Sequence, residues 1–75
     1  MKKFSFGILT TFKTGRKPLD IRLAKKSDRH TAKSLAGTLF HLEAVKSVCV
    51  FDRNGVSHFY LKKLPCGGVL KEELD

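Results

Sequence analysis

Residues 27–42 read SDRHTAKSLAGTLFHL, and this stretch decides the fold of the 75-residue chain. Ser27 and Asp28 are both good helix N-caps, because their side-chain oxygens accept hydrogen bonds from free backbone N–H groups of a first turn. Apolar residues then recur at steps of three and four, as they do on one face of an α-helix. The pattern predicts a helix from about residue 28 to about residue 42 that buries one stripe. The stripe comprises Ala32, Leu35, Ala36, Leu39 and Leu42.

Two alternating segments precede this helix. Residues 4–12 (FSFGILTTF) and residues 19–24 (LDIRLA) each gather apolar side chains on one face by alternation, at positions 4, 6, 8 and 12 and at positions 19, 21 and 23, which is typical of strands with one buried face. Residues 13–18 lie between them and contain Gly15 and Pro18, which favour a turn. The segments therefore predict a β-hairpin.

A second pair of strands is expected after the helix. Residues 45–51 (VKSVCVF) are rich in β-branched residues, and residues 56–64 return after an Asn-Gly pair at 54–55. Asn-Gly is a strong signal for a hairpin turn. Residues 65–68 (PCGG) end this strand, and we expect residues 69–75 to form a short frayed tail.

The predicted fold class is therefore α+β, with element order ββαββ. One helix should pack on one face of a four-stranded sheet formed by two hairpins. The chain is expected to be a single small domain, 1–75, with an ordered core over about 3–64 and a tail over 65–75. Over residues 3–64 the element order resembles that of β-grasp domains of the protein G type. That resemblance implies that the first and last strands pair in the centre of the sheet; a ferredoxin-like βαββ unit with an extra strand is the alternative.

Positive charge is concentrated in the first part of the chain. The chain has 15 Lys and Arg against 7 Asp and Glu, a formal net charge of +8. Residues 1–33 contain ten of these bases and two of the acids, so residues 34–75 are neutral. This asymmetry is typical of a surface that docks an anionic partner, and the alternative is a charge that serves solubility alone.

Four bases crowd the start of the predicted helix, with no evident compensating charge. The helix dipole disfavours cations there, but free backbone N–H groups and cations together form a site suited to phosphate. The sequence therefore predicts an anion site, and a solvated patch screened by salt is the alternative. We expect the first three bases to form its strongest part. The four are Lys25, Lys26, Arg29 and Lys33.

A second basic cluster lies in the predicted turn of the first hairpin. It contains Lys13, Arg16 and Lys17. The strands of this hairpin are roughly 20–25 Å long, so the turn and the helix start should lie at opposite ends. Two patches at that separation fit an extended polyanion better than one small phosphate.

The sheet face away from the helix is a third candidate surface. If Phe59 and Leu61 point toward the core, the residues alternating with them point outward. Aromatic side chains among bases can stack the bases of single-stranded nucleic acid, although such a face can equally bind a protein or a second copy. The side chains expected to stack or form an interface are Phe51, His58, Tyr60 and Lys62, with Arg22 beside them.

Motifs for catalysis and metal binding are not evident. The sequence has no Gly-rich phosphate loop, metalloprotease helix motif or nucleophile elbow. Cys66 in the PCGG turn has no base tied to it by spacing. His41, Cys49, His58 and Cys66 lack the close paired spacing of structural zinc sites. We therefore expect no enzyme activity, no metal and no cofactor.

These patterns predict a small, cytoplasmic, basic protein that binds nucleic acid, either DNA or RNA. It would contact phosphates through the helix start and the first hairpin, with little reading of bases. The alternative is an adaptor or inhibitor that captures an acidic protein through the open sheet face or an edge strand, or that pairs with itself. A viral or mobile-element modulator would fit either hypothesis. We expect no membrane association, because no apolar stretch is long enough to cross a bilayer.

Overall fold

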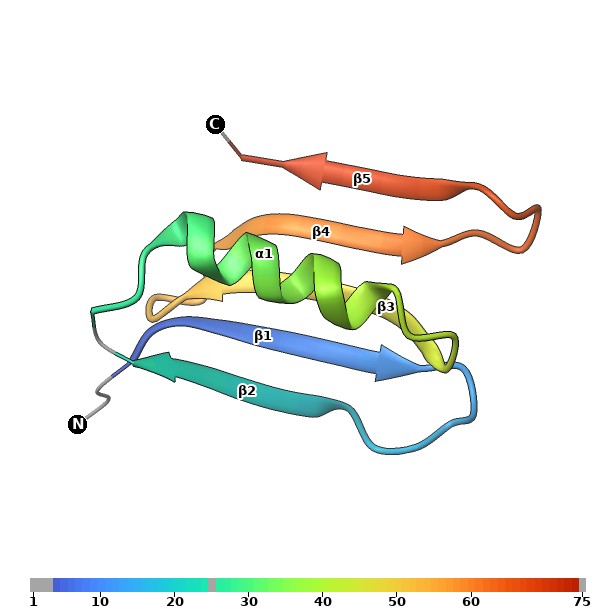
Figure 1. Ribbon diagram of the computed structural model, residues 1–75, viewed down its shortest axis with the longest axis horizontal. Coiled ribbons are helices and arrows are strands. Elements are labelled where there is room, and N and C mark those ends of the chain that lie inside the picture. The colour runs from blue at the N-terminus through green and yellow to red at the C-terminus, as the bar shows by residue number, and fades with distance from the viewer. Residues whose placement is uncertain (1–3, 25, 75) are drawn as a thin grey trace.

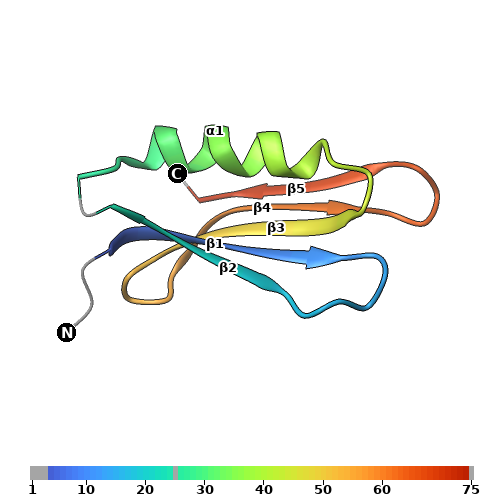
Figure 2. The same cartoon turned by 60° about the horizontal axis from the view of Figure 1, so that its bottom comes forward.

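In the part of the chain that the structure describes, a five-stranded antiparallel sheet carries a single helix across one of its faces (Figure 1). The computed structural model describes residues 4–24 and 26–74. The strands lie in the order β2-β1-β3-β4-β5. Figure 2 shows the helix along one face and the other face of the sheet uncovered. The elements are β1 (Phe4–Phe12), β2 (Leu19–Ala24), α1 (Arg29–Phe40), β3 (Val45–Asp52), β4 (Ser57–Lys63) and β5 (Val69–Glu73).

The expected α+β class is confirmed, but the pairing implied by the β-grasp resemblance is wrong. β1 pairs with β3, and not with the last strand of the second hairpin. The side chains that β3 turns toward the helix include Val45, Val48 and Val50, and all three are fully buried. A strand that buries three side chains completely gains most when it lies at the centre of the sheet, directly beneath α1. β3 therefore lies beside β1, and β4 is displaced outward.

A fifth strand replaces the frayed tail expected from the sequence. The turn before it is closed by Leu64 N–H donating to Gly68 O (2.9 Å) and Gly67 N–H donating to Leu64 O (3.0 Å). Gly67 has a φ of 95°, which favours glycine. All residues of β5 are exposed, so this strand has no buried side to produce an alternating pattern. The prediction of four strands was wrong for this reason.

The core lies between α1 and the two central strands. Ile8 of β1, Val48 and Val50 of β3, and Ala32 and Ala36 of α1 are all fully buried. The small helix residues bring the α1 backbone close to the sheet. Partly buried side chains surround this centre, namely Phe6, Phe12, Ile21, Leu23, Leu35, Leu39, Phe40 and Leu61.

The helix begins where the sequence predicts and ends slightly earlier. Asp28 is the N-cap and accepts a hydrogen bond from Thr31 N–H at 2.8 Å. The helix ends at Phe40, and that ring packs against the core. Leu42 was expected on the buried stripe, but it is 55% exposed because it lies beyond the last helical turn. Within the described residues, no helix is long and apolar enough to cross a membrane.

Candidate functional site

The loops of this fold gather at two opposite ends of the sheet (Figure 1). The helix-start end comprises the first turn of α1, the β3–β4 turn (residues 53–56) and the end of β5. The turn end comprises the β1–β2 turn (residues 13–18), the α1–β3 connection (residues 41–44) and the β4–β5 turn (residues 64–68). The described bases of the two clusters predicted from the sequence lie at different ends, as expected, while Lys25 lies outside the described residues.

Lysines at or next to the ends of three different strands surround one hollow at the turn end. Lys13 follows β1, Lys46 is the second residue of β3, and Lys63 is the last residue of β4. Together with Leu64 and Pro65 they line an open hollow of about 380 Å³. The antiparallel order brings them together, since β1 and β4 end where β3 begins. Among the residues that the structure describes, the lining of this hollow is therefore cationic and includes no acidic side chain.

Lys63 is held in place by the end of the helix. Its Nζ donates a hydrogen bond to Leu42 O at 2.8 Å and lies 5.1 Å from the centroid of the Phe40 ring. A cation is favoured there, because the carbonyl groups after a helix carry its negative dipole end. Partial burial lowers the pKa of Lys63, as does repulsion from Lys13, while Glu43 raises it. The ammonium group is thus fixed, and it retains an unfavourable interaction with a neighbouring cation.

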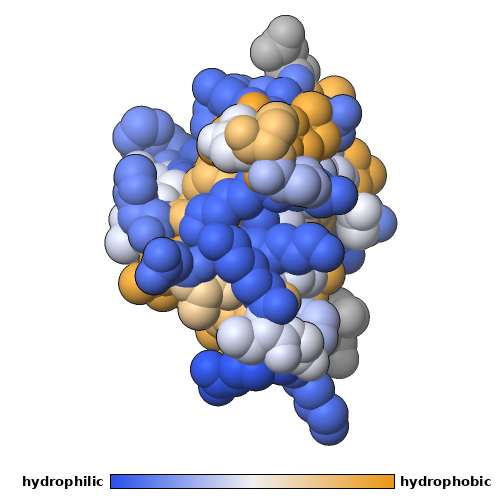
Figure 3. All heavy atoms as spheres, turned by 90° about the vertical axis from the view of Figure 1, so that its right-hand side faces the viewer, coloured by the Kyte–Doolittle hydropathy of each residue, from blue (hydrophilic) through white to orange (hydrophobic). Residues whose placement is uncertain are grey.

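The predicted turn cluster lies beside this hollow. Lys13 belongs to both, and its N–H donates to Ala44 O at 2.9 Å, which joins the turn to the α1–β3 connection. Arg16 stacks over Phe12 at 5.3 Å from the ring centroid, and Lys17 is exposed. Figure 3 looks onto the turn end and shows hydrophilic side chains gathered across it. Five cations therefore share one end of the molecule.

The bases at the helix start have a partner that the sequence did not reveal. Arg29 donates to Glu73 Oε2 at 3.4 Å, and Lys33 contacts the same carboxylate oxygen. These hydrogen bonds and charges lower the pKa of Glu73, with Lys33 contributing most. The premise that these cations lack compensation is therefore wrong for both residues. Lys26 is exposed, whereas Lys25 lies outside the described residues.

The helix N-terminus is also satisfied from within. The Asp28 carboxylate accepts the Thr31 N–H, and this hydrogen bond lowers the pKa of Asp28. A carboxylate at this position complements the helix dipole. One of the backbone N–H donors that a phosphate would use is thus already occupied. The preference of the helix N-terminus for a negative charge is already met by Asp28.

His58 lies on the helix side of the sheet, and its expected place on the open face is wrong. A β-bulge between Val50 and Phe51 shifts the register of the β3–β4 pair at this position. His58 Nε2 lies 2.9 Å from Asp52 Oδ2, and its ring meets the edge of Phe6 at 5.4 Å between centroids. The alternation that places Tyr60 and Lys62 on the open face does not extend through the bulge, because the extra residue changes which face of the sheet the next side chain points to.

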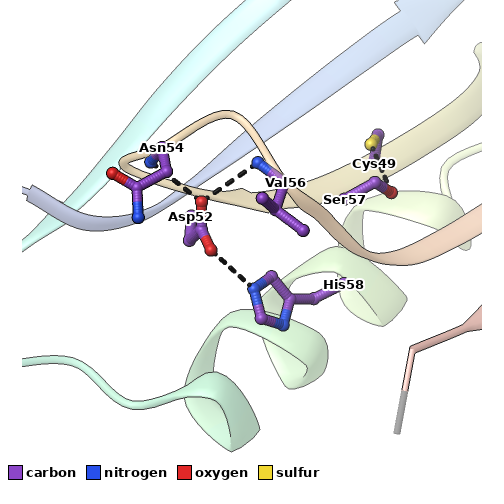
Figure 4. Close-up of polar contacts among 6 residues, drawn as sticks. All are labelled: Cys49, Asp52, Asn54, Val56, Ser57 and His58. Carbon is purple, nitrogen blue, oxygen red and sulfur yellow. Dashed lines mark hydrogen bonds and ion pairs between the residues drawn. The ribbon is translucent and has the colours of Figure 1, made fainter.

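Asp52 organises the β3–β4 turn (Figure 4). Its Oδ1 accepts hydrogen bonds from Asn54 N–H at 2.8 Å and from Val56 N–H at 3.0 Å, while its Oδ2 contacts His58. The contact with His58 is the largest cause of the lowered pKa of Asp52, followed by the hydrogen bond from Val56. Ser57 does not join this pair, because its Oγ lies 3.4 Å from Cys49 Sγ. Ser57, His58 and Asp52 therefore do not form a catalytic triad of nucleophile, base and orienting acid.

The open sheet face carries the remaining predicted aromatic residues. Register places Tyr60 opposite Cys49 and Lys62 opposite Ser47, on the face away from α1. Phe51 lies across the Gly7 backbone of β1, and a Cβ on that glycine would be 2.5 Å from the ring. Gly7 is therefore required for this packing, because a side chain there would collide with the far end of the Phe51 ring.

Arg22 also lies on the open face, since it pairs with Gly7 in the β1–β2 register. Its guanidinium lies 3.0 Å from the carboxylate of Asp20, two residues earlier on the same strand. This contact raises the pKa of Arg22. The charge of Arg22 is therefore balanced locally.

Two cations at the turn end were not among the residues predicted from the sequence. Lys46 and Lys63 belong to the neutral part of the chain, so the local charge count does not single them out. The positions of these two lysines at the ends of adjacent antiparallel strands were the signal that could have predicted that they meet at the turn end.

The described residues contain no group of three or more His, Cys, Asp or Glu arranged to hold a metal ion. Comparison with protein families, curated proteins and solved structures finds no match.

Proposed function

We propose that the protein binds nucleic acid and contacts phosphates through its turn end. The supporting observation is the convergence of Lys13, Lys46 and Lys63 on one hollow, beside Arg16 and Lys17. Grouping like charges costs folding free energy. Partial burial is the main cause of the lowered pKa of Lys63, and repulsion from Lys13 lowers it further. A bound phosphate would remove the repulsion. The helix start has a weaker claim, because Glu73 already pairs with two of its bases.

The expected mechanism is counterion release. Each phosphate neutralised by a Lys or Arg frees condensed cations, so affinity falls as salt rises. Five contacts on duplex DNA would give a slope of about −4.5 in log affinity against log salt. A contact surface made of lysines and one arginine reads the backbone and not the bases, so we expect little sequence preference.

The test compares two triple variants that remove equal charge. In the first, Lys13, Lys17 and Lys46 are replaced by Gln; Lys63 is retained because it supports the end of α1. In the second, Gln replaces Lys26, Arg29 and Lys33. The first should lower affinity for single-stranded RNA or duplex DNA about 10- to 100-fold at low salt, and should reduce the salt slope by about three. The second should have a smaller effect on both quantities.

Fluorescence anisotropy with labelled oligonucleotides at several salt concentrations measures both quantities. Circular dichroism of each variant checks that folding is retained. Equal losses in the two variants would indicate a diffuse charge effect and would contradict the turn-end site. A slope near zero for the unmodified protein would exclude nucleic-acid binding by this mechanism.

Binding of an acidic protein is the alternative function, and the open face supports it. Leu9 and Leu70 are each 38% exposed on that face, which also carries Tyr60. A protein partner would combine such apolar contacts with charge complementarity. Competition between polyglutamate and RNA separates the two functions. Preference for the carboxylate polymer at equal charge would favour the alternative.

A further inference from the structure

β2 forms one edge of the sheet, and its apolar side extends beyond the helix. The strand order ends at β2, and α1 packs against β3 and β1. Leu19 therefore remains 45% exposed, whereas Ile21 and Leu23 are partly buried against the core. An edge strand presents backbone hydrogen-bonding groups to which another strand can add.

The β2 sequence is self-complementary in an antiparallel pair centred on Ile21. In an antiparallel pair related by a two-fold axis, residues equally distant from the centre face each other. Asp20 then lies opposite Arg22 of the second copy, and Arg22 opposite Asp20. On the helix side, Ile21 faces Ile21 and Leu19 faces Leu23. The pairing thus sets opposite charges together on one face and apolar side chains together on the other.

Neighbouring registers lose this match. Centring the pair on Asp20 puts the two Asp20 carboxylates opposite each other, and centring it on Arg22 opposes the two guanidinium groups. Like charges directly opposite each other destabilise a strand pair. A slip by a single residue would place the apolar side of one strand opposite the charged side of the other. The charges therefore select the register centred on Ile21.

The other edge of the sheet does not offer the same fit. A pair of β5 strands centred on Lys71 would set two ammonium groups face to face, and centring on Glu72 would oppose two carboxylates. Both residues are exposed and belong to the outermost strand. β5 therefore serves as an internal control for edge pairing.

We propose that a second copy of this chain pairs with β2, forming a two-fold dimer with one continuous sheet. Both helices then lie on the same face, and the Leu19, Ile21 and Leu23 side chains of the two copies meet between them. Asp20 and Arg22 are 43% and 41% exposed and already contact each other, so each can exchange this partner along its own strand for one across the interface. The dimer does not depend on nucleic-acid binding.

Sedimentation equilibrium of charge variants tests the dimer and its register. We expect the unmodified protein to form a reversible dimer with a Kd of about 10–100 μM, as suits a small interface. Asp20→Arg and Arg22→Asp should each weaken the dimer about tenfold or more, because both cross-strand pairs become repulsive. An equimolar mixture of the two variants should recover dimerisation, since every pair is again opposite in charge. The double variant carrying both exchanges should also recover it.

Glu72→Arg is the matched control on the β5 edge, because it changes net charge by the same amount as Asp20→Arg. It should leave the Kd of the dimer within about twofold. The proposal is overturned if the unmodified protein stays monomeric at about 1 mM, or if the mixture of single variants associates no better than either alone. Species that grow beyond the dimer would also overturn it, because they would indicate heterologous pairing. Circular dichroism confirms that each variant is folded.

Discussion

The helix-start end and the turn end are both rich in cations, but among the described residues a carboxylate forms direct ion pairs with these cations at the helix-start end, whereas at the turn end Glu43 acts on Lys63 without a direct ion pair. At the helix start, Glu73 pairs with Arg29 and Lys33, and its pKa is lowered as a result. At the turn end, Lys13 and Lys63 repel each other beside the hollow. The comparison teaches that the number of bases in a segment does not tell which of these bases are compensated. For Arg29 and Lys33, a carboxylate from a distant strand decides it.

The largest expected effect comes from breaking the support that both ends share. Ile8 lies at the centre of the core, fully buried, on a strand that connects the two ends. Ile8→Ala should lower the free energy of unfolding by about 2–5 kcal/mol, because it removes apolar contacts and leaves a cavity. Urea unfolding followed by circular dichroism measures this change. Because both ends depend on this core, nucleic-acid binding at the two ends should be lost together.

Leu42→Ala is the control for this prediction. Leu42 is 55% exposed beyond the end of α1, so the substitution should change the unfolding free energy by less than about 0.5 kcal/mol. A cost for Leu42→Ala equal to that for Ile8→Ala would contradict the helix end and the core described above.

An intermediate effect should follow from making the helix start resemble the turn end. Glu73→Gln removes the carboxylate that Arg29 and Lys33 share, so both cations become available to phosphate. Affinity for nucleic acid should rise several-fold at low salt, and the salt slope should steepen by up to about two. Anisotropy titrations measure both quantities. Glu72→Gln removes the same charge from the opposite face of β5 and should raise affinity less.

The smallest expected effect is the pH dependence of the helix-start end. Asp52 has a lowered pKa in the folded protein, so its contribution to stability is fully present above the unfolded pKa of about 3.9 and is lost as pH falls through the folded value. Asp52→Asn keeps an oxygen acceptor for the turn but removes the charge. The variant should melt at a lower temperature than the unmodified protein at pH 7, and the difference should shrink as pH falls through the lowered pKa of Asp52. A difference that stays constant from pH 7 down through the acid range would show that the charge of Asp52 is not responsible.

Local pattern was sufficient to predict several elements and insufficient for others. Alternation over residues 4–12 predicted β1, and the cap at Asp28 with its apolar stripe predicted α1. Alternation failed at His58, because a bulge in the β3–β4 pair inserts a residue. It also failed for β5, whose side chains are exposed on both faces. In both cases the deciding interaction comes from another strand and leaves no periodic signal.

The sequence by itself determined the helix, the two hairpins around it and the excess of positive charge, because these depend on propensities and on neighbours a few residues away. The tertiary structure alone decided which of these charges are compensated. Lys33 and Glu73 are 40 residues apart in the chain, and they meet only because β5 joins the edge of the sheet beyond β4. Lys13, Lys46 and Lys63 likewise converge because three antiparallel strands begin or end at one place. Electrostatic free energy depends on distance in space, and the strand order sets that distance.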